Sequence, residues 1–203
     1  PRSVFCIPGI ILLLFALALS ILVTISLPSI HPFDIARVDF HDGLGTISNA
    51  PNNVQGEFRF GIWGYCYQTA TTSGFNCLHT GHAYSVTFAN QAGGSETVGA
   101  SWTRGLAVHA VACVVVGIAF LLSFSEHVTV TLIASLVSFL AALLTLIAFA
   151  CDIALFAWVK HQMSNLDISE STYPGPAFWM TLVTFILLLL AGCTVCFGHR
   201  RER

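Results

Sequence analysis

Two cysteines and two histidines lie close together in the longest polar segment of the sequence, and these residue types could do two kinds of chemistry. Cys66 and Cys77 have ten residues between them, a separation at which two thiols can close a small disulfide loop. His79 and His82 follow closely, so that the four side chains could instead bind zinc. Cys66 is distant from the histidines, however, and this segment contains no Cys-x-x-Cys pair. The disulfide is therefore the favoured interpretation.

No combination of residue types in the sequence is typical of an enzyme. We find no Ser-His-Asp arrangement, metal-ligand pattern or phosphate-binding loop, and we expect no catalytic residue, no cofactor and no bound metal. The formal net charge of −2 provides no basic field that could neutralise phosphates, which argues against a nucleic-acid partner. We therefore expect a non-enzymatic protein.

The composition is that of a membrane protein. Of 203 residues, 55% are hydrophobic and only 9% are charged, and the mean hydropathy is +0.78, which does not describe a soluble domain. We predict one membrane domain over 1–203, with spans at 7–28, 104–124, 128–160 and 176–197 that each reach the ~20 residues needed to cross a bilayer. Between and after them we predict an extracellular loop at 29–103, a short cytosolic turn at 125–127, a second extracellular loop at 161–175 and a cytosolic tail at 198–203.

Two of the apolar stretches differ from an ordinary span. The first could be a removable signal peptide, but it is longer than the ~7 to 15 apolar residues of a signal core, so a retained anchor is favoured. The third contains about 32 residues and would be about 48 Å long as a helix. Because this length exceeds a ~30 Å hydrocarbon core, the helix must tilt or project beyond the membrane, and we expect projection on the outer side.

The basic residues near the ends of the spans predict the orientation. Arg2 precedes the first span, and the segment 198–203 after the last span contains three arginines. The positive-inside rule then places both termini in the cytosol and the long loop outside. Of the seven cysteines only Cys66 and Cys77 lie in outer segments, where the oxidising environment permits a disulfide.

The long outer loop contains enough strand-like sequence for a small sheet. Residues 57–62 and 83–88 alternate in side-chain character and are bounded by Gly or Asn, which is typical of strands. We expect an antiparallel arrangement stapled by the disulfide. The segments 42–56 and 92–95 are rich in turn formers and predict irregular excursions, which could carry a partner-binding surface or be loops without a partner.

The disulfide segment also carries the motif Phe60-Gly61-Ile62-Trp63-Gly64-Tyr65-Cys66. Glycines around an aromatic residue are typical of a tight turn between strands. With four spans and a large first outer loop, this motif resembles the claudin-like tetraspans, and it looks like the Phe-Gly-aromatic-Gly-Tyr-Cys signature of the fungal PalI family. The segment 146–156, with Asp152 in an apolar helix, is similar to the third span of that family.

The resemblance implies a fold and a function. The expected fold is an all-α membrane protein, a claudin-like four-helix bundle with a small disulfide-stapled antiparallel sheet in the first extracellular loop. The implied function is that of a plasma-membrane accessory subunit that assists a larger receptor in fungal ambient-pH signalling. Related tetraspans organise eisosome membrane domains or support a wall-synthesising enzyme, so these roles remain alternatives. Claudin-type adhesion and a channel are less favoured. The expected partners are a larger integral membrane protein, lipids and other copies of this chain.

Asp152 is the strongest candidate for a functional side chain inside the membrane. A carboxylate on an apolar helix should face the bundle and have a partner or be protonated. On ideal helices Asp152 and His109 both lie in the outer half of the membrane, so the two could meet. Such a pair could be a static polar clamp or a pH-responsive joint.

Several histidines outside the apolar spans and two cysteines near the end of the chain are candidates for regulation. His79 and His82 could make the outer loop pH-responsive, together with His31, His41 and His161, although solvated loop histidines are often inert. Cys193 and Cys196 lie beside basic residues at the cytosolic face and are candidate palmitoylation sites. Their alternative role is packing at a helix end.

Overall fold

Four helices form the part of the protein that can cross a membrane. The computed structural model describes residues 6–30, 32–41, 46–47, 54–69, 72–90, 92–125, 127–166 and 170–200. Within these residues, the helical segments long and apolar enough to cross a membrane are Ile7–Leu27, Ala100–Leu122, Thr129–Ser164 and Pro176–Thr194. The predicted four-helix membrane protein is confirmed.

The chain forms two compact units. The first, called the helical unit, contains Pro1–Thr24, Val108–Phe149 and Trp179–Arg203. The second, called the sheet unit, contains Ile25–Ala107 and Ala150–Phe178. Both units thus include parts of the long helices, whereas all of the strands belong to the sheet unit.

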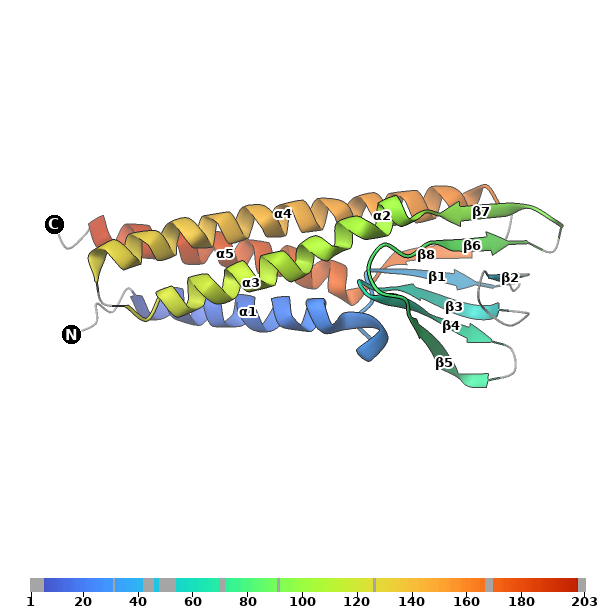
Figure 1. Ribbon diagram of the computed structural model, residues 1–203, viewed down its shortest axis with the longest axis horizontal. Coiled ribbons are helices and arrows are strands. Elements are labelled where there is room, and N and C mark those ends of the chain that lie inside the picture. The colour runs from blue at the N-terminus through green and yellow to red at the C-terminus, as the bar shows by residue number, and fades with distance from the viewer. Residues whose placement is uncertain are drawn as a thin grey trace. The chain divides into compact units, whose positions relative to one another are not determined.

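The helical unit is a bundle made by α1 (Cys6–Ser29), α3 (Val108–Leu122), α4 (Val128–Ser164) and α5 (Pro176–Arg200). The beginning of α1, the end of α5 and the α3–α4 turn lie at the same end of the bundle (Figure 1). Each helix contributes two residues to the buried core, and five of the eight are alanines, which allow close helix contact. The core residues are Leu13, Ala16, Val116, Ala119, Ala141, Ala142, Leu188 and Ala191.

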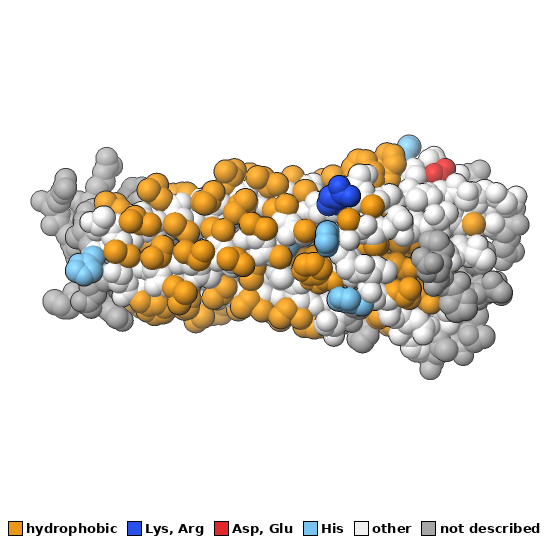
Figure 2. Space-filling view, viewed as in Figure 1, with side chains coloured by type: hydrophobic (Ala, Val, Ile, Leu, Met, Phe, Trp, Pro, Cys, Tyr) orange, Lys and Arg blue, Asp and Glu red, His pale blue; other side chains and the backbone are white. Residues whose placement is uncertain are grey.

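Helices α4 and α5 are additionally joined by hydrogen bonds through small polar side chains. Ser135 Oγ donates to the carbonyl of Gly192 and Ser138 Oγ to that of Leu188, both at 3.3 Å. Away from this core the side chains are large and apolar; Leu121 and Leu136, for example, are about 70% exposed. Hydrophobic side chains gather over the helices (Figure 2), as expected of a surface that faces lipid.

The second membrane-capable segment is interrupted near its start. It begins with α2 (Ala100–Arg104), continues through a 3₁₀ turn η1 (Gly105–Ala107) and becomes α3. A side chain at Gly105 would crowd Cys151 of α4, because its Cβ would lie 2.9 Å from Cys151 Sγ. The helix thus starts earlier than the predicted residue 104, and the glycine allows close contact at the turn.

A five-stranded antiparallel sheet dominates the sheet unit. Its order is β5-β4-β3-β1-β8. The strands are β1 (Ala36–Phe40), β3 (Val54–Phe60), β4 (Gly64–Thr69), β5 (Thr72–His79) and β8 (Glu170–Pro174). The predicted strand 57–62 lies mostly in β3 but ends at Phe60, because Gly61 and Gly64 close a turn there. Strand β8, from the loop between α4 and α5, pairs with β1 and was not predicted.

A second antiparallel sheet has the order β2-β6-β7, with β2 (Thr46–Ile47), β6 (Val86–Ala89) and β7 (Ser95–Val98). The predicted strand 83–88 overlaps β6. The two sheets pack through aromatic rings, because Phe88 of β6 lies 5.0 Å from Phe58 and 6.2 Å from both Phe40 and Phe60 between ring centroids. This aromatic cluster is the main core of the sheet unit.

The predicted excursions are partly described. Most of 42–56 lies outside the described residues, while Thr46–Ile47 forms β2 and residues 54–56 begin β3. The segment 92–95 connects β6 to β7 in a turn with Gly93 at φ +92°, a conformation that favours glycine. Gly94 N–H donates to Asn90 Oδ1 at 2.7 Å and closes this turn.

Helix α4 extends into the sheet unit and is held there by β7 and the β6–β7 turn. It has 37 residues, about 55 Å of helix, more than a ~30 Å hydrocarbon core requires. In the last turn of α4, Gln162 Nε2 donates to Glu96 Oε2 at 2.8 Å. Just after the helix ends, the carbonyl of Leu166 accepts a hydrogen bond from Asn90 Nδ2 at 2.9 Å. The excess length of α4 is therefore used as a support for the smaller sheet.

Candidate functional site

The glycine-aromatic motif forms the turn between β3 and β4. Gly61 N–H donates to the carbonyl of Gly64 at 2.9 Å and closes the turn. The carbonyl of Trp63 accepts hydrogen bonds from Thr80 N–H at 3.2 Å and Gly81 N–H at 2.9 Å. The turn is therefore hydrogen-bonded to the segment that follows β5.

A buried tyrosine links the same turn to the start of the second span. Tyr84 Oη donates to the carbonyl of Gly61 at 2.8 Å, and Thr103 Oγ1 of α2 donates to the carbonyl of Tyr84 at 2.6 Å. Burial of Tyr84 raises the pKa of its hydroxyl far above the usual value of 10.0, because the charged form would lose its solvation. The turn, the segment just before β6 and α2 are thus held together by two neutral hydrogen bonds.

The two glycines of the turn are required for close approach rather than for unusual backbone angles. A Cβ on Gly61 would collide with the side chain of Leu27 at the end of α1. A Cβ on Gly64 would collide with the carbonyl oxygen of Leu78 in β5. No other residue type fits either position without movement of the backbone.

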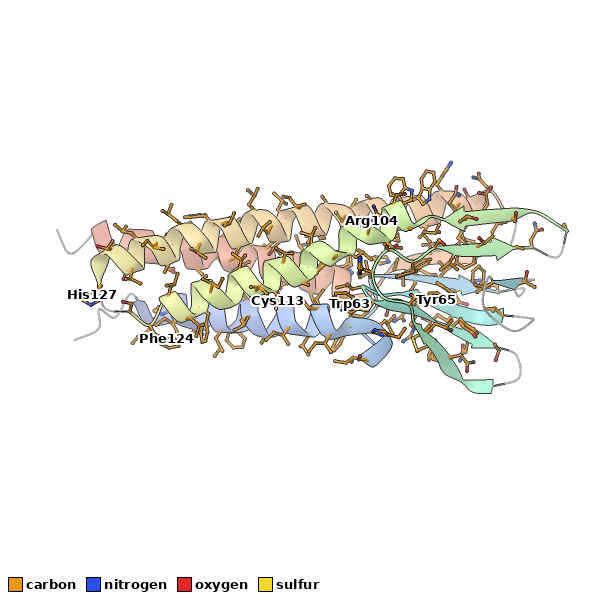
Figure 3. The ribbon with its side chains drawn as sticks, viewed as in Figure 1. Trp63, Tyr65, Arg104, Cys113, Phe124 and His127 are labelled. Carbon is orange, nitrogen blue, oxygen red and sulfur yellow. A yellow bond between two sulfur atoms is a disulfide. The ribbon has the colours of Figure 1, made fainter. Side chains whose placement is uncertain are left out.

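The aromatic residues of the motif form part of the sheet core. Phe60 and Tyr65 are fully buried, and Tyr65 lies 5.2 Å from Phe58 and 5.7 Å from Tyr84 between ring centroids. Trp63 is only half-buried and sits in the turn beside Tyr65 (Figure 3). The motif therefore specifies a shape, and it contributes no group arranged for catalysis.

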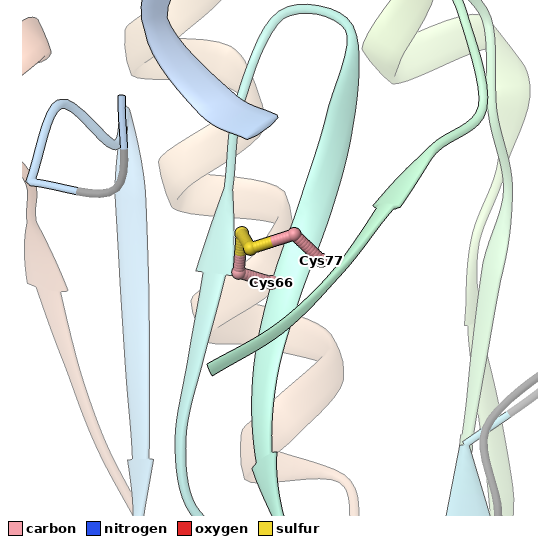
Figure 4. Close-up of a disulfide and its surroundings, with 2 residues drawn as sticks. All are labelled: Cys66 and Cys77. Carbon is pink, nitrogen blue, oxygen red and sulfur yellow. A yellow bond between two sulfur atoms is a disulfide. The ribbon is translucent and has the colours of Figure 1, made fainter. Parts of the chain in front are cut away.

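The predicted disulfide between Cys66 and Cys77 is confirmed (Figure 4). Zinc binding by both thiols, the alternative interpretation, is wrong. The two cysteines lie directly opposite each other in β4 and β5, with their Cα atoms 4.1 Å apart. This short separation is typical of a non-hydrogen-bonded antiparallel pair. It follows that the backbone N–H and C=O groups of Cys77, and of Phe75 and His79 two residues away, point from β5 toward the open side of the sheet.

The two edges of the large sheet differ in composition. The outer strand β5 has eight residues, none of them charged and none proline. The opposite outer strand β8 has five residues, beginning with Glu170 and ending with Pro174. Charged residues, proline and short length are the features that protect an edge from pairing with another strand. β8 therefore has this protection, and β5 lacks it.

A row of alternating charges crosses the sheet next to β5. The carboxylate of fully buried Asp34 accepts hydrogen bonds from Arg37 at 2.8 and 3.2 Å. Arg37 also contacts Glu57 at 2.6 Å, and Glu57 pairs with Arg59 at 2.8 Å. The Arg59 guanidinium carbon lies 4.1 Å from the centroid of the Phe75 ring in β5. The hydrogen bond to Asp34 raises the pKa of Arg37, so the Arg37 guanidinium stays charged over the physiological range.

Sequence reasoning missed this charge row, although a signal was present. Asp34 and Arg37 are three residues apart, and Glu57 and Arg59 alternate along the predicted strand. Asp34 also fixes the end of the loop between α4 and α5. Ala177 N–H at the start of α5 donates to the Asp34 carbonyl at 3.0 Å, and a Cβ on Gly175 would collide with that carbonyl. The charge row thus connects the α5 start to the edge strand β5.

The predicted histidines lie at the end of β5. His79 pairs with Gly64 of the motif turn, and His82 follows the Thr80–Gly81 contact to Trp63; both side chains are exposed. His41 and His161 are also exposed, while His31 lies outside the described residues. Their pH response remains a prediction. In the described part of the chain, no group of three or more His, Cys, Asp or Glu could hold a metal ion.

The predicted intramembrane residues are both buried. Asp152 is completely buried, in the sheet unit, and His109 is 5% exposed, in the helical unit. Their pairing remains a prediction. Cys193 is half-buried near the end of α5, and the side chain of Cys196 lies outside the described part of the chain. Palmitoylation at these cysteines also remains a prediction.

Four membrane-capable helices, the antiparallel sheets and the Cys66–Cys77 disulfide fit the expected claudin-like fold. No curated protein matches the chain significantly. A family model does match, over residues 5–192, and it describes the SUR7/PalI family. This match includes the motif turn, the disulfide, the first three membrane-capable segments and most of the fourth. The chain therefore belongs to the SUR7/PalI family.

Proposed function

We propose that this protein is a non-enzymatic plasma-membrane tetraspan with both termini in the cytosol, and that it acts as an accessory subunit of a larger integral membrane protein. Membership of the SUR7/PalI family supports a membrane role. The observation that carries the proposal is the open edge of β5. This strand has eight residues without a charge or a proline, and Phe75, Cys77 and His79 direct their backbone groups away from β4.

The β5 edge is suited to accept an extended segment of a partner. Strand addition supplies main-chain hydrogen bonds to the partner, and adjacent side chains provide specificity. The outward groups of Phe75, Cys77 and His79 are the donors and acceptors for these bonds. The disulfide keeps β5 attached to β4, and the Arg59–Phe75 contact holds the middle of the strand. The edge is therefore preorganised, which lowers the entropic cost of binding.

Gly74 offers a direct test of this edge. It lies within β5, and a Cβ at this position would meet no atom within 4 Å. Gly74→Lys introduces the charge that natural edge strands use against pairing, while Gly74→Ala adds only a methyl group. We expect a larger membrane protein to co-purify in mild detergent with the wild-type chain and Gly74→Ala, and to be lost from Gly74→Lys. A wild-type preparation without such a protein, or Gly74→Lys that retains it, would refute the proposal.

We further propose that the partner belongs to fungal ambient-pH signalling. The support is the exposed pair His79 and His82, which flanks the segment bonded to Trp63, because histidine is the residue type most often used in pH-dependent switches. The response of fungal cells to external pH should change when both histidines are replaced by Gln. An unchanged response would count against pH sensing at these residues. Co-purification of a wall-synthesising enzyme, or of eisosome components, would favour the alternative membrane-organising role.

A further inference from the structure

Two tryptophans from different helices stack on each other in the sheet unit. Trp102 of α2 and Trp158 of α4 have ring centroids 4.6 Å apart and planes inclined by 13°. Both side chains are half-buried, so part of each ring faces the surroundings. Because stacked rings lie side by side, this contact places Trp102 and Trp158 at about the same level along the two helices.

The exposed surface of α4 changes from apolar to polar at Trp158. From Leu132 to Ala157, every exposed side chain of α4 is apolar. Beyond Trp158, every exposed side chain up to residue 165 is polar, namely Lys160, His161, Ser164 and Asn165. The change runs along the helix rather than around it, because His161 lies one turn beyond Ala157 on the same face.

The second membrane-capable segment shows the same change close to Trp102. Its exposed residues Ser101 and Arg104 are polar, and Arg104 lies at the end of α2, as Figure 3 shows. From Val111 to Leu121, every exposed side chain is apolar. The long aliphatic part of Arg104 allows its guanidinium to reach water from a position slightly inside the apolar region. The two stacked tryptophans therefore mark one level at which both helices change their surface.

The length of the second segment agrees with a bilayer whose edge lies at this level. Ala100–Leu122 has 23 residues, which is about 35 Å of helix, and the hydrocarbon core of a bilayer is ~30 Å thick. A hydrocarbon core that begins at Leu122 therefore reaches Trp102. Tryptophan is enriched at the boundary between hydrocarbon and headgroups, because its ring is apolar and its N–H is polar.

We propose that the Trp102–Trp158 stack binds the interface between the hydrocarbon and the headgroups of a phospholipid bilayer, and that this boundary crosses α4 between Ala157 and His161. The rings lie against the glycerol and the upper acyl chains, and the last turn of α4 lies among headgroups and water. A bilayer fits better than a protein partner, because the same change of surface occurs on two segments that can each cross a membrane. The stack shares no residue with the β5 edge, so its test is independent of the proposed function.

Cysteine labelling tests the position of the boundary. The full chain is reconstituted into phosphatidylcholine vesicles and treated with a membrane-impermeant maleimide on both sides, so that the result does not depend on orientation. Ala157→Cys and His161→Cys are a matched pair, because both positions are exposed and lie on the same face of α4. We expect labelling of His161→Cys and none of Ala157→Cys above the level of the parent chain. After denaturation both variants should react equally.

The second segment provides an independent pair of positions. Ser101→Cys should be labelled and Val111→Cys should not, since both are exposed but lie on opposite sides of the proposed boundary. An intact Cys66–Cys77 disulfide in each variant verifies folding. Labelling of both members of either pair before denaturation, or of neither member, would overturn the proposal, because the boundary would then lie elsewhere.

Fluorescence quenching tests the stack itself. Trp63→Phe combined with Trp179→Phe leaves the stacked pair as the remaining tryptophans of the chain. Phosphatidylcholine brominated near the glycerol end of its acyl chains should quench this pair more strongly than phosphatidylcholine brominated near the methyl end. Val114→Trp, in a chain whose four natural tryptophans are replaced by Phe, should show the opposite order, because Val114 is 64% exposed and lies deeper in the apolar region.

Stronger quenching of the stacked pair from the methyl end would overturn the proposal, because the rings would then lie in the hydrocarbon core. Quenching by neither brominated lipid would also overturn it and would assign the surface to a protein partner.

Discussion

Gly64 lies directly against the backbone of Leu78, so closely that a Cβ on Gly64 would collide with the Leu78 carbonyl oxygen. Gly64→Ala should therefore push β4 and β5 apart and destabilise the protein by about 1–3 kcal/mol, the usual cost of overpacking. Thermal unfolding in detergent would measure it. Gly74→Ala, in the same hairpin but with open space around it, is the matched control and should change stability by less than about 0.5 kcal/mol. Equal effects of the two variants would contradict this account.

The disulfide should contribute substantially to stability. It closes a loop with a sequence separation of 11, for which the chain-entropy model gives about 3 kcal/mol. Replacement of both Cys66 and Cys77 by Ala should lower the unfolding free energy by that amount, and reduction of the wild-type chain should reproduce the loss. A reduced wild-type protein that unfolds at the same temperature as the oxidised one would show that the bridge is dispensable.

Asp34 should matter more than its neighbour Asp39. Asp34→Ala removes the partner of Arg37 from a completely buried position and should cost about 2 kcal/mol, as expected for hydrogen bonds to a charged group. Because Arg37 keeps 30% exposure, water replaces part of the lost contact. Asp39→Ala, in β1 and at a half-buried position, should be close to neutral. Chemical unfolding of the two variants would measure how much stability each substitution removes. Equal losses would argue against a special role for the Asp34–Arg37 pair.

Strongly alkaline medium should destabilise the sheet unit through Tyr84. Its pKa is raised in the folded state by burial, so the stabilising contribution is complete below its unfolded pKa of about 10 and is lost as the pH rises above that value. The slope should approach 1.4 kcal/mol per pH unit for this one proton. Tyr84→Phe should flatten the stability profile above pH 10, at a cost of about 1 kcal/mol at neutral pH from the lost bond to Gly61. An unchanged alkaline slope in Tyr84→Phe would assign the loss to other groups.

The predicted pairing of Asp152 with His109 can be tested by a double-mutant cycle. Asp152→Asn, His109→Gln and the double variant should show a coupling energy of about 0.6–2 kcal/mol if the two side chains interact inside the membrane. Measurement at two pH values distinguishes a static clamp, whose coupling is constant, from a pH-responsive joint, whose coupling changes. Additive effects of the two single variants would exclude the pair.

The helices were predictable from sequence because hydropathy over twenty residues is a local property. The disulfide was predictable because, of the seven cysteines, only Cys66 and Cys77 lie in the segments predicted to be outside the membrane. The strand β8 was not, because Glu170–Pro174 is short and polar and becomes a strand only through its pairing with β1, which is far away in the sequence. For the same reason the contacts of Asp34 with Gly175 and Ala177 could not be predicted from the sequence. The recurrence of glycine in the motif is explained by the structure, because a Cβ on Gly61 or Gly64 would collide with a neighbouring segment.

The position of β8 also sets an order for the assembly of the sheet. Strand β1 can pair with β3 soon after both have been synthesised, but its second edge has no partner until α4 and the following loop have been made. During that interval the large sheet has an exposed edge on each side, at β5 and at β1. The pairing of β8 with β1 can therefore form only after the third membrane-capable segment has been synthesised. A chain that stalls before Glu170 would carry an unpaired strand suited to recognition by chaperones and to aggregation.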